Sequence, residues 1–429
     1  MPTSPQVLNE VLTQKSYEFI KPPQLRQGLG RILGVGILLA EGDEHRLQRK
    51  NLMPAFSFRH VKDLYPIFWS KSAHLVKKLM AEVDAQCKSS SEATVVVDIA
   101  EWSSRATLDI IGSAGLGWEF NALDDPDNEL NATYRKVLQP TRIGQIMGLA
   151  GLVVPQWILR AIPIAHNSNI AEASQSIRKV ARELIVEKRK SLTNEKKPKN
   201  KDILSVAIES GYFSDDNLVD QLMTFLAAGH ETTATALTWA IYLLSKNSDV
   251  QRHLRTELRS ALPSPESEGQ LTVQALESCT YLHAVCNEVL RLYAPVPMTL
   301  RIAARDTTLM GHFVPKGTNI MPPVWATNTS TKLWGPDAAD FKPDRWVGSG
   351  KAGNGGAESN YAYMTFIHGP RSCLGQAFAK AEFACLVAAL IGRFSFELED
   401  DKMDIKIKGG VTARPKDGLK VKMKPLEGW

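Results

Sequence analysis

The feature that most constrains the fold is one long apolar helix, which the sequence predicts from about Ser214 to Lys246. Ser214 is a suitable N-cap, and the two aspartates that follow it suit the positive end of the helix dipole. At about 1.5 Å per residue, a helix of about thirty residues forms a rod of roughly 45 Å. A rod of that length crosses the whole core, so the other elements must be arranged around it.

Helices outnumber strands in the rest of the chain. Apolar residues spaced three and four apart predict further helices over 61–87, 172–190, 248–261, 275–293 and 375–393. Alternation within 307–324 predicts a hairpin that turns at Pro315–Gly317, and the tail beyond residue 393 has the pattern of short strands. The basic stretch 188–202 and the Gly/Ser-rich stretch 348–360 predict exposed loops. The expected fold class is mainly α with small β-sheets (α+β).

Composition narrows the class of protein. The 429 residues are 44% hydrophobic, which is enough for a packed core, and the net charge is only +5. So mild a basic excess does not indicate nucleic-acid binding. The five cysteines are scattered and contain no CxxC pair, which argues against a disulfide framework or a zinc cluster and favours a reducing compartment.

No signal peptide opens the chain, and no apolar run reaches the ~20 residues that a membrane-spanning helix needs. The nearest candidate, residues 143–165, is interrupted by polar residues and prolines such as Gln145 and Pro155. We interpret it as an apolar lid, or as a segment that dips into a membrane surface.

A single cysteine stands at the mouth of the last predicted helix, in the stretch "FIHGPRSCLGQAFAK". The helix dipole and the free N–H groups of the first turn favour the thiolate form of Cys373. Gly369 and Gly375 remove side chains where a flat partner would approach, and Arg371 supplies a charge for an anion. A sheltered thiolate approached by a planar group is what haem iron requires of a sulfur ligand.

Two other interpretations of this cysteine remain open. A buried structural cysteine would not require glycine and arginine at these offsets. A nucleophilic cysteine would require a histidine base, and His368 is too close in the sequence to be oriented freely.

The pattern F-x-x-G-x-R-x-C-x-G, formed by Phe366, Gly369, Arg371, Cys373 and Gly375, resembles the haem-binding loop of the cytochrome P450 family. The resemblance implies the P450 fold and a haem b cofactor held by the Cys373 thiolate. It also implies that Phe366, Arg371 and Gly375 contact the cofactor. In such a site the thiolate donates electron density to iron and favours O–O cleavage.

The centre of the long helix supports this resemblance. "AAGHETTAT", residues 227–235, resembles the family's oxygen-activation motif. The resemblance implies that Gly229 opens a groove for dioxygen, that the Thr232 hydroxyl holds bound oxygen or water, and that Glu231 supplies protons. A threonine-rich helix with one solvated glutamate is the alternative interpretation.

Two further segments agree with the family pattern. His45 and Arg49 lie one helical turn apart, and the resemblance places both, together with Arg301, on the haem propionates. Glu288 and Arg291 lie three residues apart in "EVLR". The resemblance joins this pair to Arg345 in a buried charge network that braces the haem side.

The function implied by the resemblance is a haem-thiolate monooxygenase that inserts one oxygen atom from O2 into a lipophilic small molecule, in fungal natural-product biosynthesis. An NADPH-dependent cytochrome P450 reductase would supply the electrons, because no flavin or nicotinamide motif is visible in the chain. The family implies attachment to the endoplasmic reticulum membrane with peripheral contact, and no nucleic-acid partner. The alternatives are a peroxide-driven or isomerising haem-thiolate enzyme, a haem-binding remnant without turnover, and a cysteine-nucleophile enzyme.

The resemblance runs from about Pro5 to the C-terminus and is nearest to the microsomal and fungal branch. We therefore expect residues 1–429 to form a single P450 domain that lacks the usual N-terminal anchor and first strands. The family also implies four walls of the substrate pocket: residues 143–165, 225–229, 296–300 and 410–411.

Overall fold

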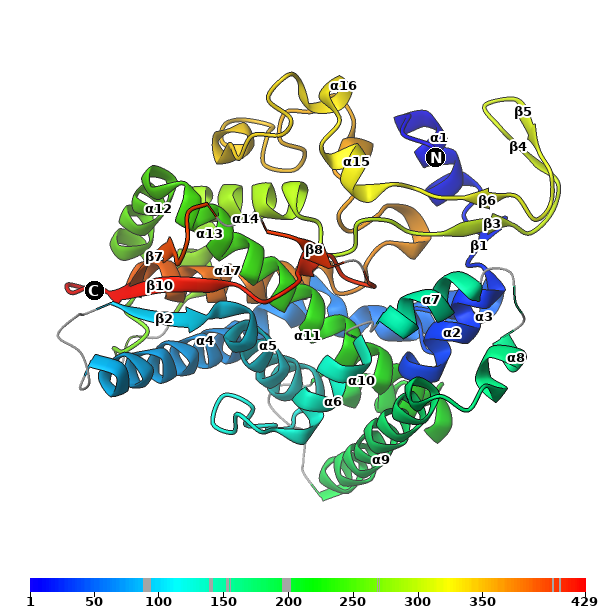
Figure 1. The fold of residues 1–429 in the computed structure, drawn as a ribbon, viewed down its shortest axis with the longest axis horizontal. Helices are drawn as coiled ribbons and strands as arrows, with labels where there is room; N and C mark the ends of the chain where they lie inside the picture. The colour runs from blue at the N-terminus through cyan, green and yellow to red at the C-terminus, as the bar shows by residue number, and fades with distance from the viewer. Residues whose placement is uncertain are drawn as a thin grey trace.

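Helix α11 (Asp215–Lys246) runs through the centre of the molecule, as the sequence predicts (Figure 1). The computed structural model describes residues 1–87, 94–138, 142–151, 154, 156–194, 202–267, 269, 271–402, 405–408 and 410–429. The Ser214 hydroxyl accepts a hydrogen bond from the Asn217 N–H, which confirms the predicted cap. Most side chains of α11 are buried because other helices pack against it, namely α5 (Ile99–Ile110), α9 (Ala165–Asn194), α14 (Thr280–Leu292) and α17 (Gln376–Arg393).

The last helix, α17, packs against α4 (Phe58–Cys87) as well as against α11. Phe68 and Phe378 meet edge to face, with ring centroids 4.8 Å apart, at the α4–α17 contact. The apolar spacing in both stretches predicted these helices. The described residues also form the α-helices α1 (Pro5–Asn9), α2 (Pro23–Leu33), α3 (Gly42–Leu52), α6 (Glu129–Leu138), α7 (Arg142–Ala150), α8 (Gln156–Ala161), α10 (Ile203–Glu209), α12 (Ser248–Ala261), α13 (Val273–Ser278), α15 (Val324–Asn328) and α16 (Thr331–Trp334).

Short turns of 3-10 or π-helix supplement these elements: η1 (Glu10–Gln14), η2 (Met53–Phe56), η3 (Ile111–Leu116), η4 (Pro343–Trp346), η5 (Asn360–Ala362) and η6 (Gly369–Arg371).

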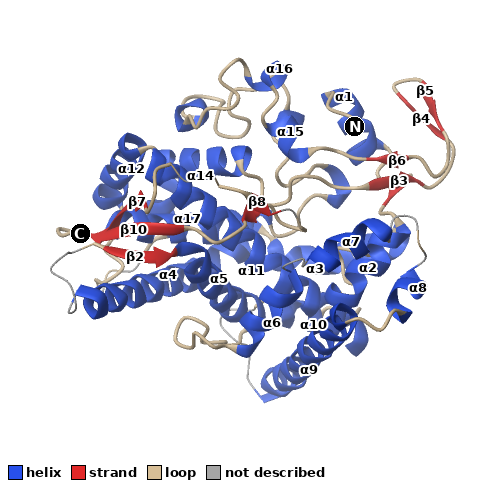
Figure 2. Ribbon diagram, in the orientation of Figure 1, coloured by secondary structure: helices blue, strands red, loops and turns tan. Residues whose placement is uncertain are grey.

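The strands of the described residues form small antiparallel sheets (Figure 2). One has the order β1 (Phe19–Ile20), β3 (Arg301–Ala303), β6 (Asn319–Ile320), and a second has the order β2 (Val95–Asp98), β10 (Lys420–Pro425), β7 (Phe394–Leu398). Two-stranded pairs join β4 (Thr307–Leu309) to β5 (His312–Val314) and β8 (Ile407–Lys408) to β9 (Arg414–Pro415). The mainly α class with small sheets is confirmed, including the short strands of the tail.

The hairpin within 307–324 turns at a different place from the predicted one. β4 and β5 are joined through Met310 and Gly311, whose φ angles are 49° and 78°. Two consecutive left-handed residues suit a tight hairpin turn. The Met310 N–H also donates to the Glu10 carboxylate, at 3.2 Å. The predicted turn at Pro315–Gly317 instead leads from β5 to β6.

The helix predicted over 275–293 is interrupted at Cys279, between α13 and α14. The N–H groups of Tyr281 and Leu282 donate to the two carboxylate oxygens of Glu257 at 2.9 and 2.8 Å. A carboxylate from α12 therefore caps the start of α14, and apolar spacing alone does not reveal a cap from another helix.

The basic stretch predicted as a loop over 188–202 begins as helix, because α9 continues to Asn194. Lys188 pairs with Asp202 and Arg189 pairs with Asp215, so acidic partners from outside α9 neutralise two of its cations. Residues 195–201 lie outside the described residues. The Gly/Ser-rich stretch is a surface loop as predicted, with residues 348–353 exposed.

The apolar stretch 143–165 contains two short helices, α7 (Arg142–Ala150) and α8 (Gln156–Ala161), and residues 152, 153 and 155 lie outside the described residues. Ile143, Ile146 and Trp157 are 52%, 65% and 72% exposed, which makes this surface unusually apolar. Among the described residues, no helix combines the length and the apolar character needed to cross a bilayer.

Candidate functional site

Cys373 lies where η6 gives way to α17. Its N–H donates to the Phe366 carbonyl at 2.9 Å, which closes the loop into a compact turn. The protein surrounds the thiol closely enough for burial to raise its pKa, while the Gly375 N–H and the Arg49 charge lower it. The side chain is nevertheless accessible to solvent. The thiol is therefore closely surrounded yet open on one side, where a metal cation would favour the thiolate.

The structure gives Gly369, one of the two glycines of this loop, a different role from the predicted one. A Cβ on Gly369, whose φ is +77°, would lie 2.1 Å from the Leu12 carbonyl oxygen. Gly369 thus makes room for the N-terminal segment and not for a flat ligand. A Cβ on Gly375 would meet only the Phe56 ring, at 3.6 Å, so Gly375 does leave space open beside Cys373.

A short accessible stretch interrupts the buried surface of α11. Ala228 is exposed, and Gly229 and Thr232 are partly exposed, although their neighbours along the helix are buried. The Phe56 ring packs against Phe225 of α11 with centroids 5.9 Å apart, and the same ring lies beside Gly375. The accessible stretch of α11 and the cysteine loop are thus bridged by one side chain, and we infer that they border the same internal space.

Gly229 has a packing role that the sequence interpretation missed. A Cβ at this position would meet Cδ1 of Ile111, in η3, at 2.7 Å. The missing side chain therefore allows η3 to approach α11, which accounts for a glycine in the middle of a helix. The Thr232 hydroxyl donates to the Ala228 carbonyl at 2.7 Å, so its oxygen lone pairs stay available to accept a hydrogen bond.

Glu231 is buried and is not a solvated glutamate. Its Oε1 accepts hydrogen bonds from Arg414 Nη1 at 2.7 Å and from the Thr412 hydroxyl at 3.3 Å. Arg414 belongs to β9, near the C-terminus, and nothing in the spacing of the sequence indicated this ion pair.

The three residues predicted to bind the propionates lie close together, with Arg371 of the cysteine loop beside them. His45 and Arg49 lie on α3, Arg301 on β3 and Arg371 on η6, and the charges of all three arginines act on His45. Lys21, just after β1, acts on the same imidazole and was not predicted. The sequence analysis also missed Glu41, whose carboxylate pairs with Arg371 and accepts from the Lys21 N–H at 2.9 Å.

This cationic cluster, formed by Lys21, Arg49, Arg301 and Arg371 around His45, carries more positive charge than Glu41 neutralises. Burial, and then repulsion by Arg301, lowers the pKa of Lys21 to about 7. Burial and the Arg371 charge lower the pKa of Arg301 to about 10. Depressed pKa values of buried cations indicate a site that an anion would stabilise. Two carboxylates, such as the propionates of haem, fit this surplus of charge.

Arg49 also contacts the cysteine loop directly. Its guanidinium donates to the carbonyl oxygen of Ser372 at 2.8 Å and to the Ser372 hydroxyl at 3.1 Å. The residue before the cysteine is therefore held by α3, a contact that was not predicted.

The charge network predicted around Glu288 is confirmed. Arg291 Nε and Nη2 each donate to the Glu288 carboxylate at 2.8 Å, and Arg345 Nε donates at 2.9 Å. Trp346 Nε1 adds a fourth bond at 2.8 Å. Glu288 and Arg291 have no exposed surface, so these bonds replace water completely.

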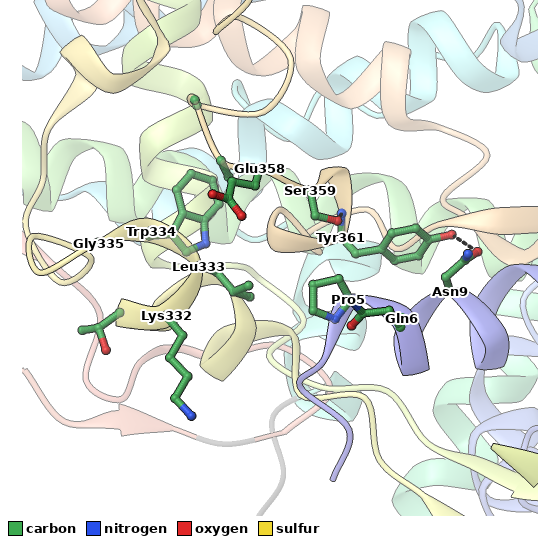
Figure 3. A pocket seen from close by; sticks show the side chains of 14 residues that line it. Pro5, Gln6, Asn9, Lys332, Leu333, Trp334, Gly335, Glu358, Ser359 and Tyr361 are labelled. Atoms are coloured by element: carbon green, nitrogen blue, oxygen red, sulfur yellow. Dashed lines mark hydrogen bonds between the residues drawn. The ribbon is translucent and has the colours of Figure 1, made fainter. Parts of the chain in front are cut away.

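A separate cavity of about 790 Å³ lies between α1, α16 and the loop 355–361 (Figure 3). Tyr361 points toward Asn9 at its edge, with a hydrogen bond of 2.9 Å. Among the described residues that line this cavity, none is a predicted site residue, so we assign the chemistry to the space beside Cys373.

The chain matches known proteins over its whole length. The family model described as Cytochrome P450 matches residues 1–423. Cytochrome P450 monooxygenase sphH of Aspergillus fumigatus is 48% identical over 100% of this chain and 79% of that protein. Cytochrome P450 monooxygenases FUM15 of Gibberella moniliformis and ALT8 of Alternaria alternata are each 42% identical over 99% of this chain, and over 79% and 81% of those proteins. With the accessible thiol and the cationic cluster, these matches show that the chain belongs to the cytochrome P450 family of haem-thiolate monooxygenases.

Proposed function

We propose that this enzyme inserts one oxygen atom from O2 into a C–H or C=C bond of a lipophilic small molecule in fungal natural-product biosynthesis. The main support is the accessible Cys373 thiol, whose loop is bonded to Arg49 of the cationic cluster. The fungal sources of the similar proteins agree with this setting.

In this proposal the Cys373 thiolate would hold the iron of a haem b, and the cationic cluster would bind its propionates. When bound, the haem supplies the activation of dioxygen. The Phe366 carbonyl accepts from the Cys373 N–H and so helps to hold the cysteine loop, while Gly375 leaves room beside the sulfur.

Thr232 and Glu231 have separate roles on α11. The Thr232 hydroxyl, fixed by its bond to Ala228, accepts a hydrogen bond from a water molecule and holds it at the accessible stretch. Glu231 relays protons to that water: its carboxylate takes up a proton from solvent before it passes one on, and its ion pair with Arg414 sets where the carboxylate lies.

The substrate class is inferred from apolar surface. Met298 and Val411 are 48% and 41% exposed, in two of the expected pocket walls, and such surfaces suit a lipophilic substrate. The exposed apolar residues of α7 and α8 support peripheral contact with a membrane, which we propose to be that of the endoplasmic reticulum. We propose an NADPH-dependent cytochrome P450 reductase as the electron donor.

The reduced carbon monoxide difference spectrum tests the haem assignment. A thiolate-ligated haem gives a far red-shifted Soret band, which we expect from the intact chain and from C286A, a control that alters a buried cysteine in α14. C373A should abolish the band. Persistence of the band in C373A would overturn the ligand assignment.

Reduction by a reductase tests the reaction class. Rapid reduction of the haem by NADPH and a P450 reductase, with product that carries oxygen from O2, is expected. Product formed only with added peroxide, or from an oxygenated substrate without reductase, would favour the peroxide-driven or isomerising alternative.

A further inference from the structure

Tyr17 and His45 are joined by a hydrogen bond beside the cationic cluster. The Tyr17 hydroxyl lies 3.1 Å from Nδ1 of His45, and the two rings meet at 60° with centroids 5.9 Å apart. The guanidinium groups of Arg46 and Arg371 lie over the Tyr17 ring, 4.0 and 4.9 Å from its centroid. These cations hold the ring in place and draw electron density from it, which makes the phenolic O–H a stronger donor.

Burial and the neighbouring cations favour the neutral form of the His45 imidazole. It is only 3% exposed, and burial followed by the charge of Arg371 lowers its pKa to about 3. A neutral imidazole carries a proton on one nitrogen only, and the other nitrogen is an acceptor. The tautomer therefore decides whether His45 can donate a hydrogen bond to an anion in the cationic cluster.

The contacts favour one tautomer. Among the described residues, the Tyr17 hydroxyl makes its side-chain hydrogen bond with Nδ1 of His45, and Nε2 of His45 makes none. If Nδ1 carried the proton, the phenolic hydrogen would lack an acceptor within the described part of the chain. If Tyr17 donates to Nδ1, both groups of this pair are satisfied and Nε2 carries the proton.

We propose that Tyr17 is a positioning residue that fixes His45 as the Nε2–H tautomer, so that Nε2 donates to a haem propionate. The inference rests on the proposed role of the cationic cluster. It explains how a histidine serves as a dependable donor here, because a hydrogen bond to one ring nitrogen determines the state of the other.

Nitrogen NMR of the carbon monoxide complex of the ferrous holoenzyme, which is diamagnetic, reads the tautomer directly. The chain has nine histidines, and loss of signals in H45Q identifies those of His45. We expect Nε2 to be protonated in the wild type, and Y17F to give a mixture of tautomers or the Nδ1–H form. Y361F is the matched control, because its hydroxyl bonds to Asn9 and Thr13 instead. Unchanged His45 signals in Y17F would overturn the proposal.

Haem release to apomyoglobin gives an independent measurement. Y17F keeps the aromatic ring, so it removes one hydrogen bond and should speed release about fivefold. In an H45L background Y17F should add nothing, because Tyr17 acts through His45. An undiminished effect of Y17F in H45L would show that Tyr17 acts only through packing, and would overturn the proposal.

The two proposals fail in different ways. Absence of the red-shifted carbon monoxide band in the wild type would refute the haem-thiolate assignment. The Tyr17 proposal is tested only with proteins that retain the band. If H45L does not retain it, the NMR comparison of wild type, Y17F and Y361F decides the outcome.

Discussion

Arg414 Nη1 lies 2.7 Å from Oε1 of Glu231 and so joins β9 to the middle of α11. The Glu231 side chain is 5% exposed and that of Arg414 is 19% exposed, so water screens this ion pair poorly. Neighbouring bonds hold the same segment, since Trp239 Nε1 donates to the Ala413 carbonyl at 2.9 Å. The C-terminal segment therefore determines where the proposed proton relay lies.

Replacing Arg414 with methionine should destabilise the protein, because it leaves the Glu231 carboxylate buried without its partner. Removing one member of a buried pair typically costs about 3–5 kcal/mol. Urea unfolding of the holoprotein measures this loss of stability. The control is K416M, which alters an exposed cation two residues away and should change the free energy of unfolding by no more than about 0.5 kcal/mol. Equal stability of R414M and K416M would refute the structural importance of the pair.

The Glu288 network should be as sensitive to the loss of one member. E288Q keeps the shape of the side chain but leaves Arg291, which has no exposed surface, without a negative partner. We expect a loss of about 3–5 kcal/mol, seen as reduced yield of folded holoprotein and a lower midpoint of thermal unfolding. D344N removes an exposed carboxylate from η4 and should have little effect. A normal midpoint for E288Q would contradict the bracing role.

Local sequence patterns correctly predicted the structural features that depend on residues close together in the chain. The cap and length of α11, the helix before the tail and the loop around Cys373 follow from apolar spacing, capping residues and the offsets of glycine and arginine. The interruption of the helix at Cys279 could not be predicted in this way, because the carboxylate that caps α14 comes from Glu257 in another helix. The hairpin turn was misplaced because Met310, a residue that rarely adopts positive φ, occupies a left-handed position.

The same distinction holds for the site. Family motifs predicted His45, Arg49, Arg301 and Arg371, and the structure brings these residues together. The sequence did not reveal Lys21, Glu41, Tyr17 or Arg414, since each acts across a large sequence separation and belongs to none of the motifs. Their importance follows from burial and charge, which appear only once the chain is folded.

Gly369 should not tolerate alanine. A methyl group there would lie 2.1 Å from the Leu12 carbonyl oxygen, and the φ of +77° is itself unfavourable for a residue with a side chain. G369A should therefore displace the cysteine loop and reduce the fraction of protein that shows the red-shifted carbon monoxide band. G353A is the control, because no atom lies within 4 Å of its added methyl group. Full haem loading of G369A would show that the loop adapts.

Stability should fall as the pH drops below about 6.5, the ordinary pKa of histidine, because buried histidines resist protonation. His230, on α11, is fully buried, and burial lowers its pKa. Its neighbours Glu231 and Arg414 act in opposite directions on that pKa. Below about pH 6.5 the unfolded chain binds a proton at this residue while the folded chain does not, so acid favours unfolding.

H230Q should flatten this pH dependence. One such histidine contributes a slope of at most about 1.4 kcal/mol per pH unit to the free energy of unfolding. Urea unfolding of the holoprotein at pH 7.5 and 5.5 measures how far the free energy of unfolding falls with acid, and this fall should be larger for the wild type than for H230Q. The control H312Q, altered at an exposed histidine in β5, should behave like the wild type. Equal differences in all three proteins would mean that other groups carry the acid sensitivity. The unfolded chain holds the extra proton, so acid must lower the free energy of unfolding of the wild type relative to that of H230Q. A wild type that instead gained stability at pH 5.5 relative to H230Q would contradict the burial of a neutral imidazole in α11.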